Sequence, residues 1–142
     1  MTASAASLSA PSARGAAFWT TQVLTAIVVV FLLADASMKL LALPIVLETQ
    51  AQLGYSTDLT FTRGLGLVLL ACVALYLHQR TMLLGAVLLT AFFGGTVATH
   101  VRVGSPVLTH ALFGVYLAVV LLANVYVRDP RIRALLPLRA GA

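Results

Sequence analysis

Residues 84–104 read LGAVLLTAFFGGTVATHVRVG and carry a strong signal for a membrane helix. This stretch begins as a purely apolar helix, becomes rich in glycine and small hydroxylated residues, and ends in a histidine and an arginine. About 20 apolar residues are enough to cross the roughly 30 Å of hydrocarbon in a bilayer. We therefore predict a transmembrane helix that carries polar groups at one end.

The composition of the whole chain also favours a membrane environment. Of the 142 residues, 61% are hydrophobic and only 9% are charged, and the mean hydropathy is +1.01. Soluble domains carry about 25% charged residues, so this chain lacks the polar residues needed to cover a soluble fold. We predict a single integral membrane domain whose solvent is the lipid bilayer.

The net charge of +5 does not indicate a nucleic-acid partner. The basic residues are too few and too scattered to follow a phosphate backbone. The chain has one cysteine, Cys72, so it has no intrachain disulfide and no Cys-x-x-Cys redox pair. Cys72 lies in an apolar run, and we interpret it as a small buried hydrophobic residue.

Four long apolar segments are separated by short polar connections. They cover approximately residues 16–43, 61–77, 82–101 and 107–127. Short connections join antiparallel neighbours, and the apolar runs are too continuous for transmembrane strands. The predicted fold is all-α: a polytopic membrane protein with an antiparallel bundle of four transmembrane helices, spanning residues 16–127.

The remaining segments flank or connect these spans. Residues 1–15, rich in alanine and serine, are predicted to be a disordered cytoplasmic tail, and residues 128–142 a basic cytoplasmic tail. The first span begins like a secretory signal peptide, but its apolar residues continue to Leu43, so we expect a retained helix. Pro44 ends that helix, and a short amphipathic helix on the membrane surface is expected before Gly54.

Lysine and arginine residues set the expected orientation. If both termini are cytoplasmic, six of the nine basic residues lie on the cytoplasmic side: Arg14, Arg80, Arg128, Arg131, Arg133 and Arg139. The positive-inside rule favours this arrangement. We therefore expect a multi-pass protein of the plasma (inner) membrane with both ends in the cytoplasm.

With this orientation, the charged and histidine residues inside the spans all fall in the outer third of the membrane. Ionised groups in hydrocarbon are costly unless they are paired or hydrated, so these side chains are expected to face the bundle interior. Thr99 lies beside them. The candidate ligand-binding residues are Asp35, Lys39, Arg63, Thr99, His100, Arg102 and His110.

The sequence permits more than one role for these charges. Asp35 and Lys39 are four residues apart on one helix face, so they can form a purely structural ion pair, or Lys39 can extend to the interface. The functional alternative is a pocket in which Lys39, Arg63 or Arg102 holds an anionic or carbonyl group. We predict no metal site, because no His-x-x-x-His or Glu-x-x-His pattern is present.

Small residues recur along one face of the third span. Ala91, Gly95 and Thr99 are spaced four apart, and Gly94 widens this face. Faces of this kind allow transmembrane helices to approach closely. Helix packing, within the chain or in a homodimer, is the expected role, and the alternative is a groove for a flat ligand.

Several short motifs resemble the DoxX-like family of membrane proteins. The third span carries most of the resemblance, through Gly94-Gly95 and the ending THVRVG at residues 99–104. Further matches are Lys39-Leu40, Leu53-Gly54-Tyr55, Arg128-Asp129-Pro130-Arg131 and Leu136-Pro137-Leu138. The chain departs from the family pattern at Ser56, where proline is frequent, and at Asp35, where a small or apolar residue is usual.

The resemblance implies a four-helix integral membrane protein but no agreed catalytic residues. The wider group includes a subunit associated with thiosulfate:quinone oxidoreduction, components linked to oxidative-stress complexes, and an animal chaperone for receptor assembly. Fold alone does not settle function among such proteins.

Three functions are compatible with the sequence. The first is a redox-associated membrane subunit that binds a quinone or other lipid-soluble molecule, whose polar head contacts Lys39, Arg63, His100 and Arg102, with His100 exchanging a proton. The second is a non-catalytic interaction or assembly factor that docks on a partner membrane protein or a second copy. The third is a membrane enzyme that acts on a lipid through acid/base chemistry at His100 or Asp35. The chain contains no nucleophile–base motif, so the sequence leaves catalysis open.

Overall fold

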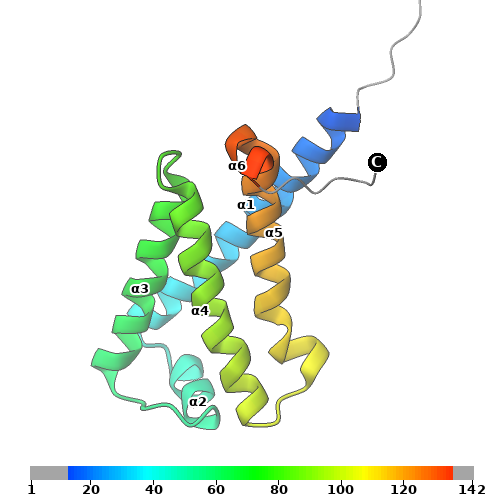
Figure 1. Ribbon diagram of the computed structural model, residues 1–142. Coiled ribbons are helices and arrows are strands. Elements are labelled where there is room, and N and C mark those ends of the chain that lie inside the picture. Colours follow the sequence, from blue (N-terminus) through cyan, green and yellow to red (C-terminus); the bar gives the residue numbers. More distant parts are fainter. Residues whose placement is uncertain (1–12, 136–142) are drawn as a thin grey trace, which may run out of the picture.

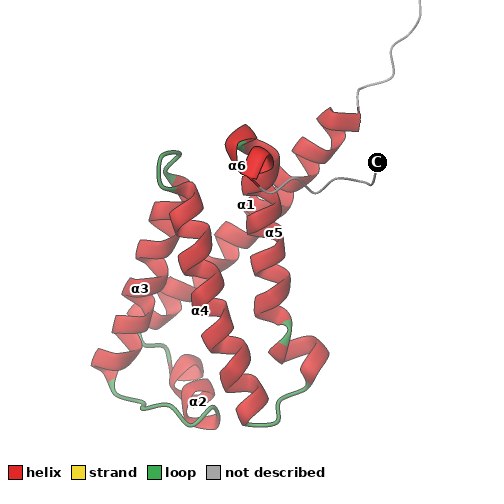
Figure 2. Ribbon diagram, in the orientation of Figure 1, coloured by secondary structure: helices red, strands yellow, loops and turns green. Residues whose placement is uncertain are grey.

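The computed structural model describes residues 13–135, and its regular elements are all helical (Figure 2). Of the predicted tails, residues 1–12 and 136–142 lie outside the described residues. The elements are α1 (Ala13–Leu40), α2 (Pro44–Gln52), α3 (Leu59–Leu77), α4 (Met82–Arg102), the π-helical turn η1 (Val107–Ala111), α5 (Phe113–Arg128) and α6 (Pro130–Leu135). The all-α fold class is confirmed.

Four helical segments are long and apolar enough to cross a membrane. They are Gly15–Leu40 of α1, α3, α4 and the continuous segment Val107–Arg128, with lengths of 19 to 26 residues and mean hydropathies of 1.8 to 2.1. They form an antiparallel bundle in which α1 and α4 each contact both α3 and α5 (Figure 1). The exposed side chains of this bundle are largely aliphatic and aromatic, as expected for a surface that faces lipid.

The structure adds detail at three places that the sequence described only approximately. The connection after the first span contains α2, which lies at the end of the bundle between α3 and α4 (Figure 1). The last span begins with the π-helical turn η1, where Pro106 accepts backbone hydrogen bonds from both His110 and Ala111. Part of the predicted basic tail forms the short helix α6.

Three helices at the α2 end of the bundle stop in the same way. After α1, α2 and α4, the amide of a residue with positive φ donates to the carbonyl three positions earlier. The amide of the next residue donates to the carbonyl five positions earlier, and this pair of bonds is a Schellman motif. The positive-φ residues are Ala42 (50°), Gly54 (73°) and Gly104 (72°). These motifs fix the positions of Tyr55 and Ser105, the residues that follow the two glycines.

Other glycines allow close helix contacts, but not the ones predicted. A Cβ at Gly85 would lie 2.2 Å from the backbone nitrogen of Tyr76, so only glycine permits this approach of α4 to α3. A Cβ at Gly94 or Gly95 would meet nothing within 4 Å. The expectation that Gly95 serves close packing within the chain is therefore wrong, because this face of α4 borders open space.

Candidate functional site

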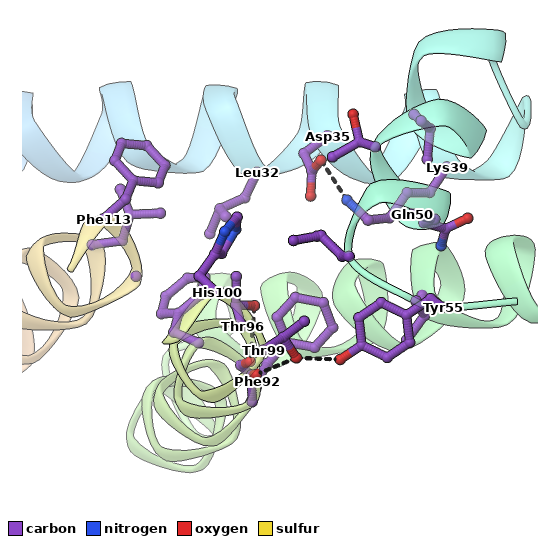
Figure 3. Close-up of a pocket in the computed structure, with 18 of the residues that line it drawn as sticks. Leu32, Asp35, Lys39, Gln50, Tyr55, Phe92, Thr96, Thr99, His100 and Phe113 are labelled. Atoms are coloured by element: carbon purple, nitrogen blue, oxygen red, sulfur yellow. Dashed lines mark hydrogen bonds and ion pairs between the residues drawn. The ribbon is translucent and has the colours of Figure 1, made fainter. Parts of the chain in front are cut away.

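A large pocket occupies the end of the bundle where α2 lies (Figure 3). Its volume is about 530 Å³, within the range of small-molecule sites. α1, α2, α4 and α5 supply most of its walls, and aromatic side chains are prominent among them: Phe31, Tyr55, Phe92, Phe93 and Phe113. Ala91, Gly95 and Thr96 also line it, so the small-residue face of α4 forms a wall of this pocket.

Asp35 and Lys39 form an ion pair on the wall that α1 contributes. The Lys39 ammonium donates to the Asp35 carboxylate, and the two side chains are 17% and 31% exposed. The predicted pairing is confirmed. Because the pair is neutral as a whole, it offers polar atoms to the pocket without adding net charge.

Gln50 brings a buried amide to the same pocket from α2. The hydroxyl of Thr62 on α3, which also lies 3.0 Å from the carbonyl of Asp58, donates to Gln50 Oε1 at 2.7 Å. Gln50 is 5% exposed, and its Nε2 has no hydrogen-bond partner among the described residues. An unsatisfied buried donor costs about 1–3 kcal/mol. A ligand with an acceptor atom would remove this cost.

Tyr55 and Thr99 join the loop after α2 to α4 at the edge of the pocket. Their hydroxyls are hydrogen-bonded to each other, and Thr99 is also bonded to the carbonyl of Gly95 at 2.9 Å. Both residues line the pocket (Figure 3). The Thr99 hydroxyl donates to Gly95, so Tyr55 is the donor in the Tyr55–Thr99 bond.

His100 occupies the wall that the end of α4 contributes. Its Nδ1 lies 3.0 Å from the hydroxyl of Ser105, the residue positioned by the Schellman motif. Nε2 has no partner among residues 13–135 and remains able to donate or accept. The ring of His110 lies 5.9 Å from that of His100, but His110 is exposed and does not line the pocket.

Two of the predicted cations lie outside the pocket. Arg102 donates to the carbonyl of Leu53 at 2.7 Å, and its guanidinium packs beside Gly54. Arg102 thus ties the end of α4 to the end of α2 and shapes the pocket indirectly. Arg63 is exposed on α3 and does not line the pocket.

The structure therefore brings four of the seven predicted residues together: Asp35, Lys39, Thr99 and His100. It adds Gln50 and Tyr55, neither of which was a predicted site residue, although Tyr55 belongs to the Leu53-Gly54-Tyr55 motif. The signal for Tyr55 was Gly54, whose positive φ directs the following residue back toward the bundle. Among the described residues, no three His, Cys, Asp or Glu side chains gather closely enough to hold a metal ion.

These features define a four-helix integral membrane protein with a mostly apolar pocket, which carries a few polar groups, at one end of its bundle. The chain belongs to the DoxX-like family, whose family model matches residues 23–124 and includes all the pocket-lining residues. No curated protein and no solved structure matches the chain.

Proposed function

We propose that this protein binds a quinone, or another lipid-soluble compound with a polar carbonyl head, in the large pocket. The observation that carries the proposal is the buried Nε2 of Gln50, which points to an acceptor that the protein itself does not supply. Lys39 and His100 add further hydrogen-bonding groups around the same cavity. A carbonyl oxygen is the acceptor that such donors suit.

The charge balance of the pocket favours a neutral ligand. Lys39 is already neutralised by Asp35, and both Arg63 and Arg102 lie outside the lining. The other polar side chains of the lining carry an amide, four hydroxyls and an imidazole. An anionic head would meet no free cation among the described lining residues, whereas a neutral carbonyl needs none.

The aromatic walls suit a flat ring and indicate a route of entry. Phe31 of α1 and Phe113 of α5 line the pocket and pack edge to face, with ring centroids 5.4 Å apart. Their side chains are 45% and 42% exposed on the bundle surface. A lipid-soluble ligand would enter between them from the bilayer without passing through water.

The membrane orientation is part of the same proposal. With both termini in the cytoplasm, as the positive-inside rule favours, the pocket lies in the outer leaflet of the plasma membrane. The function we infer is that of a ligand-binding membrane subunit. In reduction of a quinone to a quinol, a partner protein would supply both electrons, His100 would deliver one proton, and water at the membrane surface would supply the second.

Mass spectrometry of the protein extracted in a mild detergent tests the proposal. The wild type is expected to retain a lipid-soluble small molecule, and His100→Ala and Gln50→Leu are expected to lose it while remaining folded. Tyr116→Phe is the control, because Tyr116 is exposed on α5 and does not line the pocket. Wild-type protein that retains and rebinds no such molecule would refute the proposal.

A docking role is the second candidate, and Gly94 favours it. This exposed glycine on α4 has open space beside it and does not line the pocket. Exposed small residues let a second transmembrane helix approach closely. If docking is the function, Gly94→Leu releases a co-purifying membrane protein or dissociates a homodimer, and it leaves the pocket intact.

A further inference from the structure

A second cavity, of about 320 Å³, lies at the opposite end of the bundle from the large pocket. It is found near the ends of α3 and α5, where α6 and the α3–α4 turn lie (Figure 1). Its lining residues are Gln22, Thr25, Ala26, Val29 and Val30 of α1, Tyr76 and Leu77 of α3, and Asn124 and Arg128 of α5. None of them belongs to the site described above.

Three oxygen atoms in this lining are buried and unpartnered. Gln22 Oε1, Thr25 Oγ1 and Asn124 Oδ1 have no hydrogen-bond partner among the described residues. Thr25 is 8% exposed and Asn124 is 1% exposed. A buried polar atom that stays unsatisfied destabilises the fold. Gln22 Oε1 and Asn124 Oδ1 can only accept, and the Thr25 hydroxyl can accept or donate, so the cavity favours a molecule that carries hydrogen-bond donors.

The orientation of the Asn124 amide is set by its neighbours. Its Nδ2 donates to the hydroxyl of Tyr76 at 2.8 Å, and that hydroxyl donates to the carbonyl of Leu121 at 3.4 Å. In this arrangement both bonds form at once, whereas turning the amide over would require the Tyr76 proton to leave the carbonyl of Leu121. Asn124 Oδ1 is the atom of the amide that remains without a partner among the described residues.

Arg128 gives the cavity a cationic edge. It lies in the last turn of α5, four residues and about 6 Å beyond Asn124. Arginine binds phosphate through paired N–H donors, and Arg128 has no acidic partner among the described residues. A ligand bound here can place its phosphate on Arg128. The hydrogen-bond donors of the ligand then lie one helical turn deeper in the cavity.

The walls of the cavity face the bilayer. Val30 and Leu77 are 66% and 57% exposed on the apolar surface of the bundle. Trp19, 68% exposed, lies on α1 six residues before Thr25, or about 9 Å along the helix. Tryptophan is enriched at the level of lipid headgroups, which puts the cavity just below that level.

We propose that this cavity binds the headgroup region of a phospholipid whose head carries hydrogen-bond donors. Arg128 holds the phosphate, and the head folds back past it into the cavity, where Gln22, Thr25 and Asn124 accept from the ammonium of ethanolamine or the hydroxyls of glycerol. A choline head offers no N–H or O–H donor, so phosphatidylcholine is the control lipid and is expected to bind more weakly. The acyl chains leave along Val30 and Leu77. A water molecule takes up about 30 Å³, so water alone is the competing occupant.

Binding of short-chain phospholipids to delipidated protein in detergent, followed by native mass spectrometry, tests this site. Phosphatidylethanolamine or phosphatidylglycerol is expected to bind at least about fivefold more tightly than phosphatidylcholine. Comparing these two lipids shows whether the ammonium or the hydroxyl groups are the donor. The double variant Gln22→Leu/Thr25→Val is expected to abolish this preference. Arg128→Gln is expected to weaken all three lipids, whereas Arg80→Gln, a charge loss at an exposed position outside the cavity, leaves them unchanged.

Equal affinity for the three headgroups in the wild type would overturn the proposal, as would an unchanged preference in the double variant. If the double variant does not fold, the isosteric Thr25→Val alone is measured against the same criterion. A density map that shows only water in the cavity of phospholipid-loaded protein also overturns it. The outcome does not depend on the ligand of the large pocket.

Discussion

Tyr55 and Thr99 are hydrogen-bonded to each other although they are 44 positions apart in the chain. Tyr55 follows the glycine that ends α2, and Thr99 lies one turn before the end of α4. The bond therefore joins the short helix α2 to the membrane-spanning bundle at the edge of the large pocket. Arg102, bonded to the carbonyl of Leu53, reinforces the same junction.

Tyr55→Phe removes the bond to Thr99 and keeps the aromatic ring. We expect the variant to fold, because one hydrogen bond contributes only about 1 kcal/mol, and to release the pocket ligand several-fold faster as α2 loosens. Dissociation rates measured by ligand exchange check this. Tyr126→Phe on α5, outside the pocket lining, is the control, and equal rates in both variants would contradict the role of Tyr55.

The Asp35–Lys39 pair separates a structural role from a ligand-binding one. Asp35→Asn or Lys39→Met leaves one half-buried charge alone, and each is expected to lower the unfolding midpoint in detergent. The double variant has no unpaired charge and should recover most of that loss, which is about 1 kcal/mol for a pair of this exposure. Ligand affinity should stay reduced in the double variant if Lys39 contacts the ligand. Full recovery of both quantities would make the pair structural only.

Ala42 is expected to be a site where glycine stabilises the protein. Its φ of 50° is unfavourable for a residue with a Cβ, at a position where α2 and α4 have glycine. Ala42→Gly should raise the free energy of unfolding by up to about 1 kcal/mol. Ala74→Gly, at an exposed position inside α3, should lower it by about 0.5–1 kcal/mol. Two losses of equal size would contradict the strain at Ala42.

The proposed orientation is tested by cysteine labelling in intact cells. In a Cys72→Ala background, Thr57→Cys between α2 and α3 should react with a membrane-impermeant maleimide added outside. Gln79→Cys in the α3–α4 turn should react only after the cells are opened. The reverse pattern would place both termini outside and the large pocket in the cytoplasmic leaflet.

The fold was largely predictable because membrane helices depend on local properties. Long apolar runs and short polar turns identify α3, α4 and the last span to within a few residues, whereas the first helix ends at Leu40, before the predicted Leu43, and Pro44 begins α2. The π-helical turn after Pro106 was not predictable, because it depends on the Ala111 amide bonding to the Pro106 carbonyl in addition to the His110 amide.

The membrane depth of the site residues could be predicted from the sequence, but which of them face the pocket could not. His100 and Arg102 lie at nearly the same membrane level, two positions apart on α4. His100 lines the pocket, whereas Arg102 does not line it and bonds to the carbonyl of Leu53. Gln50 was missed because its role depends on Thr62 of another helix, which holds its amide. Gly95 was misassigned to packing, since sequence spacing does not reveal whether a neighbouring helix is present.

The most direct test of ligand binding compares two adjacent glycines of α4. Gly95 lines the large pocket and Gly94 does not, and a new side chain meets open space at either position. Gly95→Leu and Gly94→Leu therefore gain the same helix propensity, but only the first fills the pocket. Calorimetric titration with a short-chain benzoquinone should show saturable binding to the wild type and to Gly94→Leu, and at least about tenfold weaker binding, or 1.4 kcal/mol, to Gly95→Leu. No saturable binding to the wild type, or equal binding to all three proteins, would contradict the proposed pocket.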